Sequence, residues 1–391
     1  MPLKILMMAD TPADPNRGAA GTEVQTLNAL RALGHEVDAI WAGDLGRRIQ
    51  HGNLHLLLEL PRAYERAAVA ALRCKEYDVV HANQPHGFRA ARTVNRLWPR
   101  TVFIHRTHGF ELNVEETLRP WRERYGVSER SAIRRAASRT LASLLARHAQ
   151  AIAREADGHI VSASLDAAFL NERLGVPRER IAVIPQAAPD SYLRSDPPLM
   201  DVQRLRRVLH VAQVAFFKAP MITAAAINRL AEKERELRFT WVCDRTSEGS
   251  IRALLTSDAS ERTAVQHWTS QDALREIYDQ HGTFLFPSFF EGFGKAFLEA
   301  MSRGLCVVAS DVGGMHDLII GCKSNGRNGI VVPPGDVEAL ADSALAIIRD
   351  PERAQAMSAA AIQTAREHTW ERVARETADF YRARIEARTR V

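Results

Sequence analysis

The sequence has little cysteine and no long apolar stretch. Four cysteines occur among 391 residues, scattered without the spacing of metal ligands: Cys74, Cys243, Cys306 and Cys322. This pattern argues against a zinc module and indicates free thiols in a reducing compartment. No apolar run approaches the roughly 20 residues that span a bilayer, and the run within residues 1–10 is too short for a secretory signal. We therefore expect a cytoplasmic protein.

Three further absences narrow the chemistry. No G-x-G-x-x-G follows the first predicted strand, which disfavours a nicotinamide-dependent oxidoreductase. Neither a D-x-D motif nor a histidine–aspartate cluster is present, so we expect no metal site and no cofactor. No aromatic stacking pattern accompanies the arginine-rich region, which disfavours a nucleic-acid partner.

Positive charge is concentrated in one region. The net charge is +5, yet the segment from Arg119 to Arg154 holds nine arginines and only two acids. Helical spacing puts one set of its residues on an apolar face and another on a basic face: Ile133, Ala137, Leu141, Leu144, Leu145 and Ile152, against Arg135, Arg139, Arg147 and Arg154. The basic face of the predicted helix 130–154 is either solvated or a surface for an anionic membrane or lipid-phosphate acceptor. The second reading places the protein peripherally at the inner face of a membrane.

Short apolar runs alternate with helical patterns along nearly the whole chain. The first half has six predicted strands, at residues 4–10, 37–41, 78–83, 101–109, 159–164 and 181–186. The second half has another six, at residues 207–213, 238–244, 263–268, 283–288, 306–311 and 329–334. Continuous apolar strands separated by helices predict parallel sheets covered on both faces. The fold class is therefore α/β, with two doubly wound domains.

The predicted domain organisation follows from this alternation. Residues 1–190 form the first domain and 206–369 the second, joined by a linker at 191–205 that is rich in proline and aspartate and lacks periodicity. Residues 370–391 are expected as a separate final helix that can pack back on the first domain. Ligands of such sheets bind beyond the carboxyl ends of the strands.

One stretch after a strand combines glycines with two carboxylates. Residues 283–288 predict a strand, 288–294 (SFFEGFG) a turn, and 295–304 a helix closed by Gly304. Gly292 and Gly294 are expected to supply turn conformations and backbone N–H groups, while Glu291 and Glu299 flank them. Such a layout suits a ligand with hydroxyls at both ends and phosphates between, as in a nucleotide sugar. Two solvated glutamates on an amphipathic helix are the alternative.

Residues 287–314, PSFFEGFGKAFLEAMSRGLCVVASDVGG, resemble the donor-site segment of retaining GT-B glycosyltransferases of family 4, the group 1 glycosyltransferases. Further similarity lies in residues 21–37, 78–83 and 161–185. The resemblance implies two Rossmann-like domains facing across a cleft. It also implies metal-independent hexosyl transfer from a UDP- or GDP-sugar to a glycan, lipid-linked or small-molecule acceptor. Family members with lipid-linked acceptors commonly dock through the first domain.

The resemblance also implies roles for residues of the second domain. Glu291, with the Phe293 and Gly294 backbone, would hold hydroxyls of the donor sugar, and Glu299 would hold the ribose hydroxyls. Lys218 would meet the charge of the departing diphosphate. Gln213 stands where the family usually has an arginine, and it supplies no charge.

In the first domain, the resemblance implies that Gly21 approaches the phosphate or acceptor, that Glu23 begins the helix, and that His108 lies near the donor sugar. Gly18 and Gly21 are expected to flank the loop before that helix. His105 should lie on the opposite strand face from His108, which excludes a metal pair. A front-face attack assisted by the phosphate is what the family implies for retention.

Other readings remain open. Lys218 could be a surface lysine and His108 a satisfied loop histidine. Gln213, and the sequence IPQAAPD at 184–190 where the family usually has Asn-Gly, motivate a non-catalytic binding or activating subunit. A nucleotide-sugar isomerase is a third possibility, separable by whether product forms without an acceptor.

Overall fold

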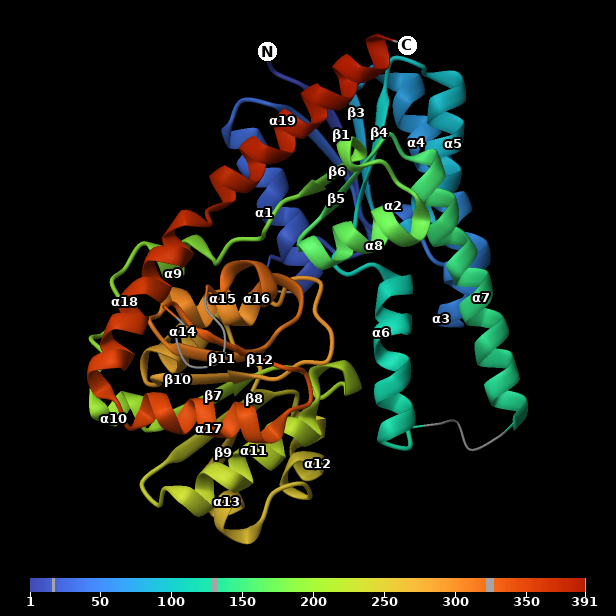
Figure 1. Cartoon of the computed structure of the whole chain (residues 1–391). Coiled ribbons are helices and arrows are strands. Elements are labelled where there is room, and N and C mark those ends of the chain that lie inside the picture. Colours follow the sequence, from blue (N-terminus) through green and yellow to red (C-terminus); the bar gives the residue numbers. More distant parts are fainter. Residues whose placement is uncertain (16–17, 128–131, 321–326, 391) are drawn as a thin grey trace. The chain divides into compact units, whose positions relative to one another are not determined.

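A computed structural model describes residues 1–15, 18–127, 132–320 and 327–390, with the backbone alone at Glu111 and at 132–139. The chain forms two compact units, Met1–Gln186 with Trp370–Val391, and Ala187–Thr369. Residues 191–205, predicted as a linker, therefore belong to the second unit, and the final helix belongs to the first. Figure 1 shows the elements of each unit.

The first unit is built on a six-stranded parallel sheet in the order β2-β1-β3-β4-β5-β6. Its strands are β1 (Lys4–Met8), β2 (Glu36–Ile40), β3 (Val79–Asn83), β4 (Val102–Arg106), β5 (Gly158–Val161) and β6 (Ile181–Val183). Its helical segments are α1 (Gly18–Ala32), α2 (Ala42–Leu45), α3 (Gly52–Leu54), η1 (His55–Glu59), α4 (Leu60–Cys74), η2 (Pro85–Gly87), α5 (Phe88–Leu97), α6 (Glu111–Arg124), α7 (Ala132–Glu155), α8 (Ser164–Leu174), η3 (Arg178–Arg180) and α19 (Trp370–Thr389).

Both faces of this sheet are covered. On one face, Leu6, Val80 and Phe103 pack with Tyr64 of α4 and Ile152 of α7 in one apolar cluster. On the other, α1 and α19 lie against each other and α19 contacts β4 (Figure 1). The last helix is therefore part of the first unit's structure, because it covers a sheet face that would otherwise be exposed.

The second unit repeats the design with a six-stranded parallel sheet in the order β12-β11-β10-β7-β8-β9. Its strands are β7 (Arg207–Val211), β8 (Arg238–Cys243), β9 (Thr263–His267), β10 (Thr283–Phe286), β11 (Cys306–Ser310) and β12 (Ile330–Val332). Its helical segments are α9 (Asp190–Leu193), α10 (Val202–Leu205), η4 (Phe216–Lys218), α11 (Pro220–Lys233), η5 (Arg245–Ser247), α12 (Glu248–Arg252), α13 (Ser257–Glu261), α14 (Gln271–Asp279), α15 (Lys295–Ser302), α16 (Gly313–Leu318), α17 (Val337–Ile348) and α18 (Pro351–Glu367). Two parallel sheets with flanking helices confirm the predicted α/β class.

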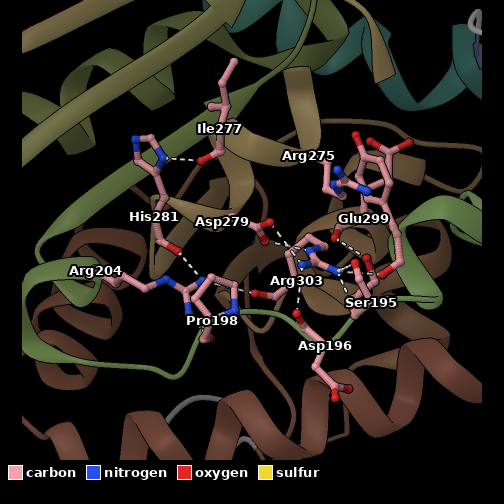
Figure 2. Close-up of polar contacts among 12 residues, drawn as sticks. Ser195, Asp196, Pro198, Arg204, Arg275, Ile277, Asp279, His281, Glu299 and Arg303 are labelled. Carbon is pink, nitrogen blue, oxygen red and sulfur yellow. Dashed lines mark hydrogen bonds and ion pairs between the residues drawn. The ribbon is translucent and has the colours of Figure 1, made fainter. Parts of the chain in front are cut away.

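Two arginines fasten residues 191–205 to the second unit (Figure 2). Arg303, directly after α15, is only 2% exposed and donates to the carbonyls of Tyr192 and Ser195 at 2.7 and 2.8 Å. Arg204 donates to the carbonyls of His281 and Arg303 at 3.0 and 3.1 Å. The segment thus has a fixed path, because buried guanidinium groups hold its backbone oxygens.

The arginine-rich helix is described in part. Residues 130 and 131 and the side chains of Ile133, Arg135, Ala137 and Arg139 lie outside the described residues. On the remainder of α7, Ile152 is fully buried, whereas Leu144 is 37% exposed although helical spacing assigned it to the apolar face. The described part of the chain contains no helix long and apolar enough to cross a bilayer.

Candidate functional site

The loops of interest in the second unit follow adjacent strands. β7 and β10 pair with each other at the point where the strand order reverses, so their carboxyl ends flank a topological switch point. Ligands of doubly wound sheets bind beside such a point, because the loops there diverge to opposite faces. Lys218 ends the short η4 turn after β7, and Glu291 lies in the loop after β10. Strand order therefore brings together two residues that lie 73 positions apart.

Lys218 and Glu291 form a buried ion pair. Lys218 Nζ lies 2.6 Å from Glu291 Oε1, and the side chains are 16% and 6% exposed. Ser288 donates its hydroxyl to the same oxygen at 2.6 Å. The ammonium also lies 5.2 and 5.1 Å from the ring centroids of Phe217 and Phe286, within cation–π range. Lys218 is thus no surface lysine, because it is enclosed by a carboxylate and aromatic faces.

Close packing holds the Glu291 loop in place. The Phe289 amide donates to the Phe217 carbonyl at 2.8 Å, which joins the two loops. Gly313, at φ +54°, packs so tightly that an added Cβ would lie 2.6 Å from the Glu291 carbonyl oxygen. Gly294 has φ +94°, as expected for a turn glycine, whereas Gly292 is not among the residues with positive φ. The expectation that both glycines adopt conformations closed to other residues is therefore wrong for Gly292.

Glu299 lies on the buried face of α15 and not on its solvent-exposed face. Its side chain is 6% exposed, and its carboxylate accepts a hydrogen bond from the Tyr278 hydroxyl at 3.2 Å. Burial raises the pKa of Glu299, while the charge of Lys295 and the Tyr278 hydrogen bond oppose the rise. A carboxylate held in this way is stabilised by further hydroxyl donors. The alternative of two solvated glutamates is excluded, since Glu291 is also only 8% exposed.

Gln213 lies on the loop between β7 and Lys218. It lies two residues after the end of β7, it is exposed, and its carbonyl accepts from the Ala215 amide at 2.9 Å. Gln213 therefore stands on the loop that leads to Lys218 without contributing a charge to it.

In the first unit, His108 and Glu23 form a close pair. His108 Nε2 lies 2.7 Å from Glu23 Oε1, and the side chains are 9% and 1% exposed. α1 begins at Gly18, so Gly18 and Gly21 lie within the helix and Glu23 does not begin it. The expected loop position was wrong because Ala19 and Ala20, strong helix formers, carry the helix towards the N-terminus.

His105, which was not expected to form a metal site with His108, pairs with another histidine. His105 is fully buried, and its Nδ1 lies 3.1 Å from Nδ1 of His159 on the neighbouring strand. Burial lowers the pKa of both histidines, so they are neutral core residues. Among the residues that the structure describes, no group of three or more metal-binding side chains is found.

Asp10, at the carboxyl end of β1, was missed by the sequence reasoning. Its amide donates to Asn83 Oδ1 at 3.2 Å, joining the ends of β1 and β3, the strands between which the order reverses in this sheet. Burial raises the pKa of the Asp10 carboxyl from 3.8 to about 6, although a backbone hydrogen bond and the charge of His108 oppose the rise. Its position directly after the first strand was the available signal. Ser288 and Tyr278 were also missed. Ser288 bonds Glu291 within the same loop, whereas the contact of Tyr278 with Glu299 depends on how α14 packs against α15.

The raised pKa of Asp10 predicts a pH-dependent stability cost. Well below pH 3.8 the carboxyl is neutral in both states. As pH rises towards 6, the unfolded chain ionises first, so stability is lost and the cost then stays constant. Asp10→Asn should therefore stabilise the protein at neutral pH by about 2 to 3 kcal/mol and leave acid stability unchanged. Thermal melts across this range would measure it, and a gain that is equal at all pH values would contradict it.

Comparisons with known proteins agree with this architecture. The family described as Glycosyltransferase Family 4 matches residues 18–191, and Glycosyl transferases group 1 matches residues 206–350. The D-inositol 3-phosphate glycosyltransferase of Thermobispora bispora is 27% identical over 59% of this chain and 57% of its own length. The O-antigen chain mannosyltransferase B of Escherichia coli is 31% identical over 29% of each chain. The matched regions thus span less than two thirds of these relatives.

Solved structures extend the likeness of fold to nearly the whole chain. Sucrose-phosphate synthase from Thermosynechococcus elongatus matches with a TM-score of 0.75 and 20% identity, over 98% of this chain and 100% of that one. Anabaena HepE in complex with UDP matches with a TM-score of 0.68 and 17% identity, over 96% and 99%. The two family matches cover successive halves of the chain and correspond to its two sheets. The chain therefore belongs to the group 1 and family 4 glycosyltransferases, with the GT-B fold.

Proposed function

We propose that the protein is a retaining glycosyltransferase that moves a hexosyl group from a UDP- or GDP-sugar to a hydroxyl of a glycan, lipid-linked or small-molecule acceptor, without a metal ion. The observation that carries this proposal is the buried Lys218–Glu291 pair at the switch point of the second sheet. A cation and a carboxylate on adjacent loops suit the two parts of such a donor. The cation suits the negatively charged diphosphate, and the carboxylate can accept hydrogen bonds from the sugar hydroxyls.

Each residue acts on a different part of the donor in this proposal. Lys218 stabilises the negative charge that develops on the diphosphate as the sugar–phosphate bond breaks. Glu291 holds Lys218 until the donor arrives and then accepts sugar hydroxyls with its carboxylate. Glu299 accepts the ribose hydroxyls, which supply the donors that a buried carboxylate favours. The free N–H groups at the start of α15 face phosphate oxygens.

Uridine donors are the first to test. Anabaena HepE is described in complex with UDP and with UDP-glucose, and a TarM variant with UDP and alpha-GlcNAc-glycerol. A thermal-shift panel of UDP, GDP, ADP and their sugars, followed by assays of donor consumption with and without a chelator, tests the proposal. If no nucleotide sugar binds or is consumed, the proposed activity is wrong. Loss of activity in the chelator would contradict metal independence alone.

Glu299 and Glu291 should have separable effects on ligand binding. A ligand at 100 times its Kd stabilises the native state by about 2.7 kcal/mol. We expect Glu299→Ala to abolish the thermal shift with free UDP or GDP. Glu291→Ala should preserve that shift and lose only the additional stabilisation from the sugar. Glu338→Ala, which removes an exposed glutamate of the same unit, serves as the matched control. Equal losses on free nucleoside diphosphate in both site variants would contradict the division.

Gln213 favours a second candidate function, a non-catalytic binding or activating subunit. Its neutral, exposed side chain stands five positions before Lys218, where an arginine would add a second charge for the diphosphate. Gln213→Arg distinguishes the two. A gain of activity from none would support the non-catalytic function, whereas measurable activity in the unchanged protein would exclude it.

A further inference from the structure

Glu23 lies at the centre of a chain of polar side chains in the first unit. Its Oε1 is 2.7 Å from His108 Nε2, and its Oε2 is 3.8 Å from His81 Nε2. Burial would raise the pKa of Glu23, but the hydrogen bond from His108 and the nearby charge of Arg106 lower it. Asp10 is the other nearby acid. Glu23 is therefore a carboxylate at neutral pH, and it can only accept hydrogen bonds.

This carboxylate decides where the ring of His108 carries its proton. Since Glu23 only accepts, Nε2 of His108 must donate. The other ring nitrogen, Nδ1, is buried and has no partner among the described residues. An unpaired buried polar atom costs about 1–3 kcal/mol. A ligand hydroxyl that donates to Nδ1 would remove that cost, so the ring is prepared to accept a hydrogen bond there.

The other oxygen of Glu23 faces a second oriented ring. His81 and Tyr381 are fully buried, and His81 Nδ1 is hydrogen-bonded to the hydroxyl of Tyr381, which lies 300 residues later on α19. Burial lowers the pKa of His81 to about 4, so the ring is neutral. When the hydroxyl donates to Nδ1, the proton of His81 resides on Nε2, on the side of Glu23. Tyr381 of the last helix thus orients His81, which faces the second oxygen of Glu23.

We propose that Glu23 is a positioning residue for the transfer reaction: it holds a proton of His108 on Nε2, so that Nδ1 is the atom that accepts a hydrogen bond from a ligand hydroxyl. The catalytic part rests on the proposed function, whereas the position of the proton does not. Arg106 and Asp10 also bear on Glu23 through their charges, but only His108 bonds to it within normal hydrogen-bond distance among the described residues. A merely structural role for Glu23 is the competing explanation.

Nitrogen NMR of the resting protein tests the position of the proton. The ring resonances of histidine-labelled protein are assigned to His108 by their loss in His108→Ala, and spectra are recorded over a pH series, so that singly and doubly protonated rings are distinguished. We expect Nε2 to carry the proton and Nδ1 to be bare, with the Nδ1-protonated form appearing in Glu23→Gln. A ring protonated on Nδ1 in the unchanged protein would overturn the proposal. This measurement needs no donor, so it decides the proton position even if no sugar is transferred.

A kinetic cycle tests whether Glu23 acts through His108. We expect Glu23→Gln to lower kcat about 10- to 100-fold, within the range of general acid–base effects, with little change in KM. In a His108→Ala background the same substitution should change kcat less than about threefold, because the residue it positions is gone. Tyr381→Phe should show a smaller loss with the same dependence, while Tyr77→Phe, whose hydroxyl bonds Asp38 instead, should have no effect. Equal losses in both backgrounds, or a loss that follows reduced thermal stability, would overturn the positioning role.

Discussion

Lys218→Ala should lower the rate of sugar transfer by about 10²- to 10³-fold, the largest kinetic effect that we expect from one substitution in the second unit. The reason is electrostatic. Departure of the diphosphate concentrates negative charge, and Lys218 is a cation on the loop after β7, at the switch point, 16% exposed and thus partly shielded from water. In such surroundings the interaction of two charges is several times stronger than in bulk solvent.

The measurement is kcat and KM for a donor identified by the thermal-shift panel. Because Lys218 also pairs with Glu291, its removal leaves a carboxylate unpaired, so melting temperatures must be recorded alongside. The double variant Lys218→Met with Glu291→Gln removes both charges and restores a neutral site, which separates lost stability from lost catalysis. Lys233→Ala, at an exposed end of α11, is the control. A Lys218→Ala enzyme within about threefold of the native rate would exclude the leaving-group role.

The fold could be predicted from the sequence because its main signal is local. All twelve predicted strands form in the part of the chain that the structure describes. The central strands are buried, as expected for a parallel sheet covered on both faces, whereas the edge strands β2, β6 and β9 are partly exposed. The start of α1 was placed too late for an equally local reason. Glycines suggested a loop, but Ala19 and Ala20 between them favour a helix. Propensity summed over the whole segment was the better guide.

The partners within the site could not be predicted in the same way. Lys218 and Glu291 were each selected as residues that follow a strand, but their contact depends on β7 pairing with β10, which is a property of strand order. The contact of His108 with Glu23, 85 positions away, depends on how α1 packs against the sheet. Tyr381 reaches His81 only because α19 returns to the first unit. A resemblance supplies the residues at a site, whereas hydrogen-bond partners come from packing.

The contacts of residues 191–205 were also set by packing and not by local sequence. The substitution with the largest expected effect on stability removes the residue that holds this segment. Proline and aspartate suggested a free linker, because neither residue favours a helix or a strand. What holds the segment is Arg303, which also donates to Asp279 at 2.7 and 3.1 Å in a bidentate pair (Figure 2). Planar guanidinium groups suit this task, since five donors can satisfy a carboxylate and backbone carbonyls at once.

Arg303→Ala should therefore destabilise the second unit by about 3–5 kcal/mol, because it removes the donors to the Asp279 carboxylate, the buried Tyr192 carbonyl and the Ser195 carbonyl. A loss of this size lowers the melting temperature of a unit of this length by roughly 10 °C. Calorimetry would measure the shift, and limited proteolysis within 191–205 would show whether the segment is released. Arg235→Ala, at an exposed position of the same unit, is the control. Because Arg303 directly follows α15, the variant should also weaken the UDP-dependent thermal shift that Glu299 supports. An unchanged melting temperature would mean that the segment is held by other contacts and that α15 does not depend on it.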